Sequence, residues 1–97
     1  MLSANTSIAE LLETYSRRHP QEVLLVNLQA DDKIDEVMIF KGFSSSLMHP
    51  TAYDADVAVI PDHAEVLYIS RLKAPYQPNA PQYLQEKISW AQFLELL

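Results

Sequence analysis

The chain has 97 residues, no cysteine and a formal net charge of −6, from 7 basic and 13 acidic residues. This length suits a single domain, 1–97, with one modest core. Without cysteine the chain has no disulfide, thiolate metal ligand or cysteine nucleophile, and its acidic balance argues against a nucleic-acid partner.

Neither a signal-peptide pattern nor an apolar run near the ~20 residues that span a bilayer is present in the sequence. We therefore expect a cytoplasmic protein without a membrane partner.

A helix is predicted directly after Ser7. Ser7 and Glu10 form a capping box. Apolar residues then follow at the spacing of one helical face, namely Ile8, Leu11, Leu12 and Tyr15. Pro20 disfavours helical geometry at His19, so the helix should end there.

Three β-rich segments predict strands, at 23–29, 36–41 and 65–72. The polar segment 30–35 has the length of a hairpin connection. Apolar residues on both faces of the first two strands indicate that each face is at least partly covered. Between the second and third strands, 57–60 has the composition of a further strand, whereas 42–56 has no period and reads as a loop.

The C-terminal part begins with a proline-rich segment, 73–81, whose prolines recur at the period of polyproline II. Pro81 can start a short helix continued by Tyr83, Leu84, Lys87 and Ile88. Ser89 and Gln92 form a second capping box, with Ile88 and Phe93 as a hydrophobic staple. A final helix should therefore present the stripe Trp90, Phe93, Leu94 and Leu97.

Together these elements predict an α/β fold of the α+β type. We expect an antiparallel sheet of at least three strands, with an N-terminal helix and C-terminal helices packed on it.

Two groups of residues suggest catalysis or metal binding. Ser44, Ser45 and Ser46 precede His49, but the nucleophile motif G-x-S-x-G is absent, so a polar loop is the better interpretation. Histidine and carboxylate ligands for zinc or iron are available from His49, Asp54, Asp56 and His63. Their spacing matches no short ligand motif, and we predict no metal and no cofactor.

Two further segments allow binding. Arg71 and Lys73, near the end of the third strand, are a possible anion-binding pair, or else a solvated strand end. The segment from Pro75 to Pro78 reads either as a P-x-x-P ligand or as a stiff connector laid on its own domain.

The 42–56 loop is the strongest candidate for an interaction surface. It gathers large apolar side chains between elements, namely Phe43, Leu47, Met48 and Tyr53. Exposed apolar patches mark interaction sites. The alternative is that the loop folds back and these residues belong to the core.

One stretch, Phe40-Lys41-Gly42-Phe43-Ser44-Ser45-Ser46-Leu47-Met48 followed by Pro50-Thr51-Ala52, resembles a small uncharacterised domain family of cyanobacteria and plant plastids. The same pattern is supported by Asp54-Ala55-Asp56, Pro61, Arg71-Leu72, Pro75-Tyr76 and Trp90, so that the resemblance covers about residues 23–94. The resemblance implies that the protein resides in a cyanobacterial cytoplasm or a plastid stroma, and it suggests no particular activity.

The sequence therefore favours a non-catalytic interaction or regulatory protein that binds a larger protein through the 42–56 region. The alternative is a small-molecule- or metal-binding enzyme that uses His49, Asp54, Asp56, His63 or Arg71.

Overall fold

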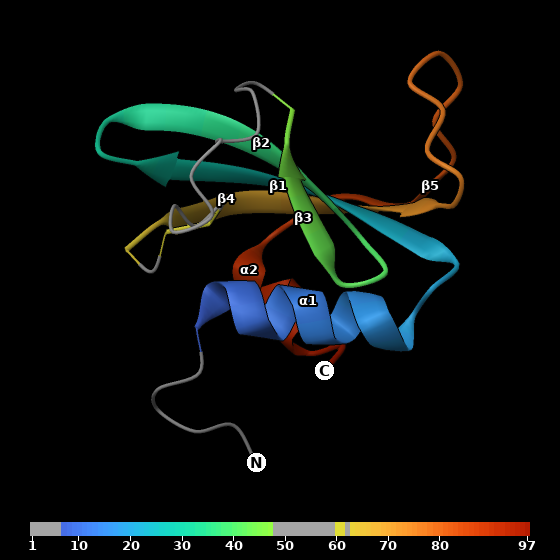
Figure 1. Ribbon diagram of the computed structural model, residues 1–97, viewed down its shortest axis with the longest axis horizontal. Coiled ribbons are helices and arrows are strands. Elements are labelled where there is room, and N and C mark those ends of the chain that lie inside the picture. The colour runs from blue at the N-terminus through green and yellow to red at the C-terminus, as the bar shows by residue number, and fades with distance from the viewer. Residues whose placement is uncertain (1–6, 48–59, 62) are drawn as a thin grey trace.

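The computed structural model describes residues 7–47, 60–61 and 63–97. In chain order the elements are α1 (Ile8–Arg18), β1 (Glu22–Ala30), β2 (Lys33–Phe40), β3 (Phe43–Ser46), β4 (Glu65–Lys73), β5 (Tyr83–Ile88) and α2 (Trp90–Leu94). The strands form one antiparallel sheet in the order β3-β2-β1-β4-β5 (Figure 1). The predicted α+β class is confirmed.

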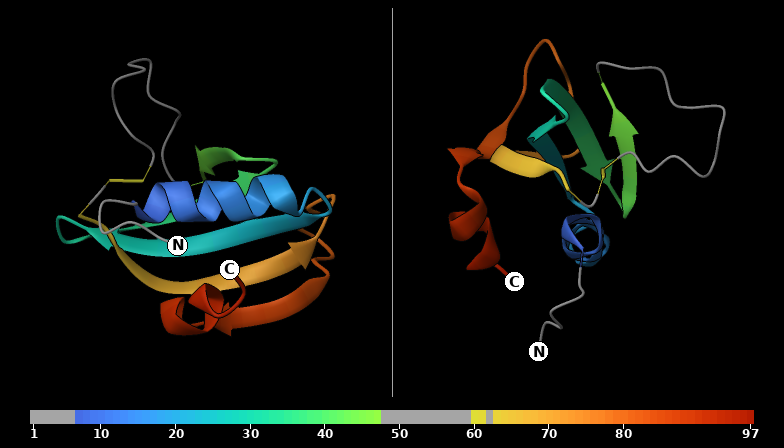
Figure 2. Two further views of the ribbon diagram at one scale, coloured as in Figure 1. Left: turned by 90° about the horizontal axis from the view of Figure 1, so that it is seen from below. Right: turned by 90° about the vertical axis from the view of Figure 1, so that its left-hand side faces the viewer.

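Both helices lie on the same side of the sheet (Figure 2). α1 covers β1 and β2, and α2 covers β4. The main core lies between the helices and this face, with Leu12, Leu24, Ile39, Ile69 and Phe93 fully buried. No helix among the described residues is both long and apolar enough to cross a membrane.

The opposite face of the sheet carries a second, smaller core. Val23, Leu25 and Leu72 are buried there. They are covered by Ala74 and Tyr76, which belong to the proline-rich segment between β4 and β5. This segment therefore lies against its own domain, as the connector interpretation expected.

The capping signals place the starts of both helices correctly. The Ser7 hydroxyl accepts from the Glu10 N–H at 3.1 Å, and α1 ends at Arg18 before Pro20. At α2, Ser89 and Gln92 form both hydrogen bonds of a capping box. α2 ends at Leu94, so it is shorter than the stripe to Leu97 predicted.

Two sequence predictions were wrong. The segment from Tyr83 to Ile88 is strand β5 rather than a helix, because its backbone pairs with β4, with Ile88 opposite Ile69. Tertiary pairing overrides a short helical pattern. The first part of the predicted 42–56 loop is strand β3, which pairs with β2 from Phe43 to Ser46. Of the predicted strand at 57–60, residues 57–59 lie outside the described residues, whereas Ile60 is buried in the main core.

Both hairpins flanking β2 use two-residue turns with positive φ. Asp31 and Asp32 form the first, so the connection is shorter than the predicted 30–35. Lys41 and Gly42 form the second, with φ of 51° and 85°. Such turns match the natural twist of paired strands.

Gly42, the single glycine of the chain, ties the β2–β3 hairpin to α1. Its N–H donates to the buried hydroxyl of Ser16 at 3.1 Å. A Cβ added at this position would lie 2.5 Å from Cγ of Arg17. Backbone conformation and close approach to α1 therefore both favour glycine at this position.

Replacement of this glycine should destabilise the hairpin. We expect Gly42→Ala to lower the free energy of unfolding by about 1–2 kcal/mol, from the positive φ and the displaced Arg17 side chain. In thermal melts this corresponds to a loss of several degrees. The double variant Gly42→Ala, Arg17→Ala removes the contact and should recover part of the loss. An unchanged melting temperature in Gly42→Ala would contradict this account of the turn.

Candidate functional site

The structure places two of the predicted partner-binding residues at an edge of the sheet. Phe43 begins β3 and its side chain is 78% exposed, the highest value among the exposed large hydrophobic residues of the described chain. Leu47 follows β3 and is 42% exposed. Its N–H donates to the Glu36 carbonyl at 2.8 Å. Met48 and Tyr53 lie outside the described residues.

Phe43 belongs to an apolar row that crosses all five strands. The paired positions place Phe43 beside Phe40, Phe40 beside Val23, Val23 beside Leu72, and Leu72 beside Tyr83. Paired residues share a face of the sheet. Because Val23 and Leu72 belong to the second core, the apolar row lies on the face without helices.

The two ends of the apolar row are open to solvent. Phe43 is exposed at the β3 edge, and Tyr83 is 45% exposed at the β5 edge. Between them Val23 and Leu72 are buried, and Phe40 is half-buried. Phe43 is a predicted partner-binding residue, whereas Tyr83 was not predicted to belong to this surface because its segment has the pattern of a short helix. Only the strand register shows that the two residues belong to one surface.

The serines of β3 hold the strand in place. The Ser44 hydroxyl donates to Oε2 of Glu13 on α1 at 2.7 Å. The Ser46 hydroxyl donates to the Asp35 carboxylate on β2, at 2.9 Å from its Oδ1. His49 lies outside the described residues. The hydroxyls of Ser44 and Ser46 thus bond side chains of α1 and β2, and the polar loop predicted for these serines is a strand.

The proposed metal ligands are only partly described. His63 Nε2 lies 3.1 Å from Asp31 Oδ2, with both side chains exposed. The other candidates, His49, Asp54 and Asp56, fall outside the described residues. Among residues 7–47, 60–61 and 63–97, no group of three or more metal-ligating side chains occurs.

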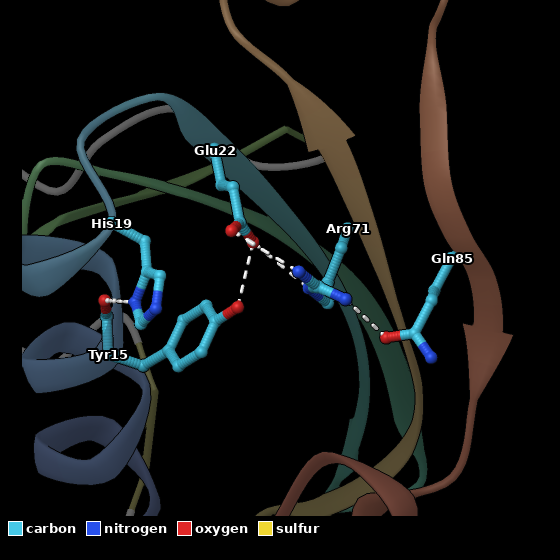
Figure 3. Close-up of polar contacts among 5 residues, drawn as sticks. All are labelled: Tyr15, His19, Glu22, Arg71 and Gln85. Atoms are coloured by element: carbon cyan, nitrogen blue, oxygen red, sulfur yellow. Dashed lines mark hydrogen bonds and ion pairs between the residues drawn. The ribbon is translucent and has the colours of Figure 1, made fainter. Parts of the chain in front are cut away.

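Arg71 belongs to a polar network between α1 and the sheet (Figure 3). Its guanidinium makes two hydrogen bonds to the Glu22 carboxylate, 2.9 Å from Nε to Oε1 and 3.2 Å from Nη2 to Oε2. A third bond goes to the Gln85 side chain, which connects β4 to β5. The Tyr15 hydroxyl donates to Glu22 at 2.8 Å, and the Tyr15 ring stacks on His19.

Burial and pairing hold this network in one protonation state near neutral pH. Burial, reinforced by the hydrogen bond to Glu22, raises the pKa of Tyr15 to about 12. Burial acts to raise the pKa of Glu22, but hydrogen bonds from Arg71 and Tyr15 outweigh it and the pKa falls below its usual value. The hydrogen bond to Glu22 raises the pKa of Arg71. All three shifts move the pKa away from neutral pH, which does not favour proton transfer by these groups near pH 7.

The two residues of the predicted anion-binding pair, Arg71 and Lys73, have different surroundings. The Arg71 guanidinium is occupied by Glu22 and Gln85, and its side chain is only 18% exposed. Lys73, two residues on, is exposed. It lines an open groove of about 550 Å³ whose apolar part consists of Pro20, Ala74, Pro75 and Leu84.

A family model described as "Domain of unknown function (DUF7734)" matches residues 9–97, nearly the whole fold, and the chain belongs to this family. Membership of an uncharacterised domain family is thus confirmed. Neither the curated proteins nor the solved structures gave a significant match.

Burial of Tyr15, reinforced by its hydrogen bond to Glu22, predicts a difference in alkaline stability between wild type and Tyr15→Phe. A tyrosine whose folded pKa is raised stabilises the fold below its unfolded value of 10.0, and this stability is lost as pH rises toward about 12. Between neutral pH and about pH 11, the free energy of unfolding of wild type should therefore fall by about 1 kcal/mol more than that of Tyr15→Phe. Urea unfolding of both proteins at both pH values measures this difference. An equal loss of stability in the two proteins would show that the pKa of Tyr15 is not raised by the fold.

Proposed function

We propose that this domain is a non-catalytic interaction or regulatory module that binds a larger protein through the 42–56 region, beginning with Phe43 and Leu47. The observation that supports this proposal most is the exposure of Phe43 at one end of the apolar row. Large aromatic side chains at the surface are typical anchors of protein interfaces. Met48 and Tyr53 follow Leu47 in the chain and belong to the same proposed surface.

The position of Phe43 on an edge strand strengthens this proposal. Among the described strands, β3 lies at the edge of the sheet and pairs with β2. An edge strand offers backbone groups as well as side chains to a partner. A partner that contacts this edge would meet the Phe43 ring at the start of the strand and the Leu47 side chain just after its end.

The alternative, an enzyme that uses His49, Asp54, Asp56, His63 or Arg71, has weaker support. Arg71 is bonded to Glu22 and Gln85, and His63 contacts only the exposed Asp31 among the described residues. A catalytic site needs groups that are free to act on a reacting atom, whereas Arg71, Glu22 and Tyr15 are hydrogen-bonded to one another.

The resemblance to cyanobacterial and plastid proteins supports a cyanobacterial cytoplasm or a plastid stroma as the setting that we propose for the partner. The net charge of −6 supports a protein rather than a nucleic acid as partner, since the long-range field of the molecule repels a polyanion.

The proposal predicts that Phe43→Asp removes partner binding without unfolding the domain. Because the side chain is exposed, the free energy of unfolding should change by less than about 0.5–1 kcal/mol. Ile34→Asp is the matched control, because Ile34 is also an exposed apolar residue, at the far end of β2. Affinity capture from the native source, compared by mass spectrometry, should give a partner retained by Ile34→Asp and lost by Phe43→Asp.

Two results would contradict the proposal. A collapse of the melting temperature in Phe43→Asp would show that the ring is part of the core. Equal loss of the captured protein in both variants would show that this end of the apolar row has no special role.

A further inference from the structure

Basic side chains gather at one end of the sheet. α1 ends with Arg17 and Arg18, the β2–β3 turn contains Lys41, and β4 ends at Lys73. The strand register brings these segments together. Lys73 pairs with the first residue of β1, and the next residue of β1 pairs with the last residue of β2. We call Arg17, Arg18, Lys41 and Lys73 the basic end; the end of α1 and the end of β4 lie on the right in Figure 1.

The opposite end of the sheet is acidic. The β1–β2 turn, the start of β2 and the start of β4 meet there, carrying one lysine, Lys33, and five acidic residues, namely Asp31, Asp32, Asp35, Glu36 and Glu65. Charge is therefore separated along the strand direction, and the net value of −6 conceals a cationic surface.

The four cations of the basic end are exposed and not neutralised within the described chain. The ion pairs of the described chain join Arg71 to Glu22 and His63 to Asp31, so neither pair includes one of these four cations. Arg17 donates to the Thr14 hydroxyl, and Lys41 Nζ lies 5.1 Å from the centre of the Phe40 ring. The helix dipole accounts for basic residues at the end of α1, but not for Lys41 and Lys73.

An apolar groove opens at the same end. Pro20, Ala74, Pro75 and Leu84 line it together with Lys73 and Glu22. The Glu22 carboxylate is already bonded by Arg71 and Tyr15, so Lys73 is the charged group of the lining that has no counter-ion in the described chain. The groove thus combines a surface for an apolar side chain with a cation beside it.

We propose that the basic end binds an acidic segment of a partner protein, with an apolar side chain of that segment in the groove. This inference rests on the proposed function and names the chemistry of the partner. A short acidic segment meets only the local cationic surface. A nucleic acid would extend beyond it into the repulsive field of the remaining molecule, so the charge distribution favours a protein segment.

The test uses a short fluorescein-labelled peptide of aspartate and glutamate around a central phenylalanine, with anisotropy as the readout. Lys41→Glu with Lys73→Glu should weaken binding by about tenfold or more, and added salt should weaken it in wild type. Lys33→Glu with Lys87→Glu is the matched control, because it changes the net charge equally away from the basic end. It should retain most of the affinity. Leu84→Ser should reduce the affinity for this peptide more than it reduces the affinity for a second peptide that has serine in place of the central phenylalanine.

Several outcomes would overturn the proposal. Equal weakening by the two charge-reversal pairs would show a response to net charge alone. Tighter binding of a single-stranded RNA of similar length would identify a nucleic-acid surface. Wild-type self-association in sedimentation that disappears in Lys41→Glu with Lys73→Glu would identify a second copy as the occupant.

The same variants separate this inference from the proposed function. If a captured partner is lost by Phe43→Asp but retained by Lys41→Glu with Lys73→Glu, the proposed function stands and the acidic-segment inference fails. If Phe43→Asp retains the partner, but Lys41→Glu with Lys73→Glu weakens peptide binding as expected, the proposed binding surface at Phe43 is refuted and the acidic-segment inference stands.

Discussion

The central strand β1 must be covered on both faces, and the rest of the structure depends on this constraint. Its residues from Val23 to Val26 are all buried, and they alternate between the two sides of the sheet. Both helices cover one side. Within the described chain, the proline-rich segment packs on the other side, through Ala74 and Tyr76. The apolar row is therefore buried at its centre and exposed at Phe43 and Tyr83, which gives the molecule an apolar surface beyond the needs of its own core.

The polar interactions position the edges of this sheet. Arg71 joins β4 to β1 through Glu22 and to β5 through Gln85, while Tyr15 ties α1 to the same carboxylate. Each of two buried serines accepts a hydrogen bond from a residue with positive φ: Ser16 from Gly42 before β3, and Ser70 from Lys87 in β5. Edge strands held in this way present fixed side chains, which a binding surface requires.

Sequence patterns predicted those elements whose signals are local. Capping residues located both helices, and β-rich runs located β1, β2 and β4. β5 was missed because Pro81 and a short apolar spacing imitate a helix, whereas its pairing with β4 is a long-range contact. β3 was missed because three serines carry little strand propensity, and the turn at Gly42 creates the pairing. Phe43 was a candidate from composition, but the apolar row and the basic end both depend on strand register, which hydrophobic periodicity did not reveal.

Hydroxyl-radical footprinting of the free protein tests most directly whether the apolar row is open at its ends. The reaction rate of an aromatic ring follows its contact with solvent, and mass spectrometry assigns the oxidised residue. Phe43 should react at a rate approaching that of the unfolded chain and Tyr83 at an intermediate rate, while Tyr15 and Phe93, which are buried between the helices and the sheet, should be protected. Protection of Phe43 to the level of Phe93 would contradict the account, since it would show that the protein itself covers the surface proposed for its partner.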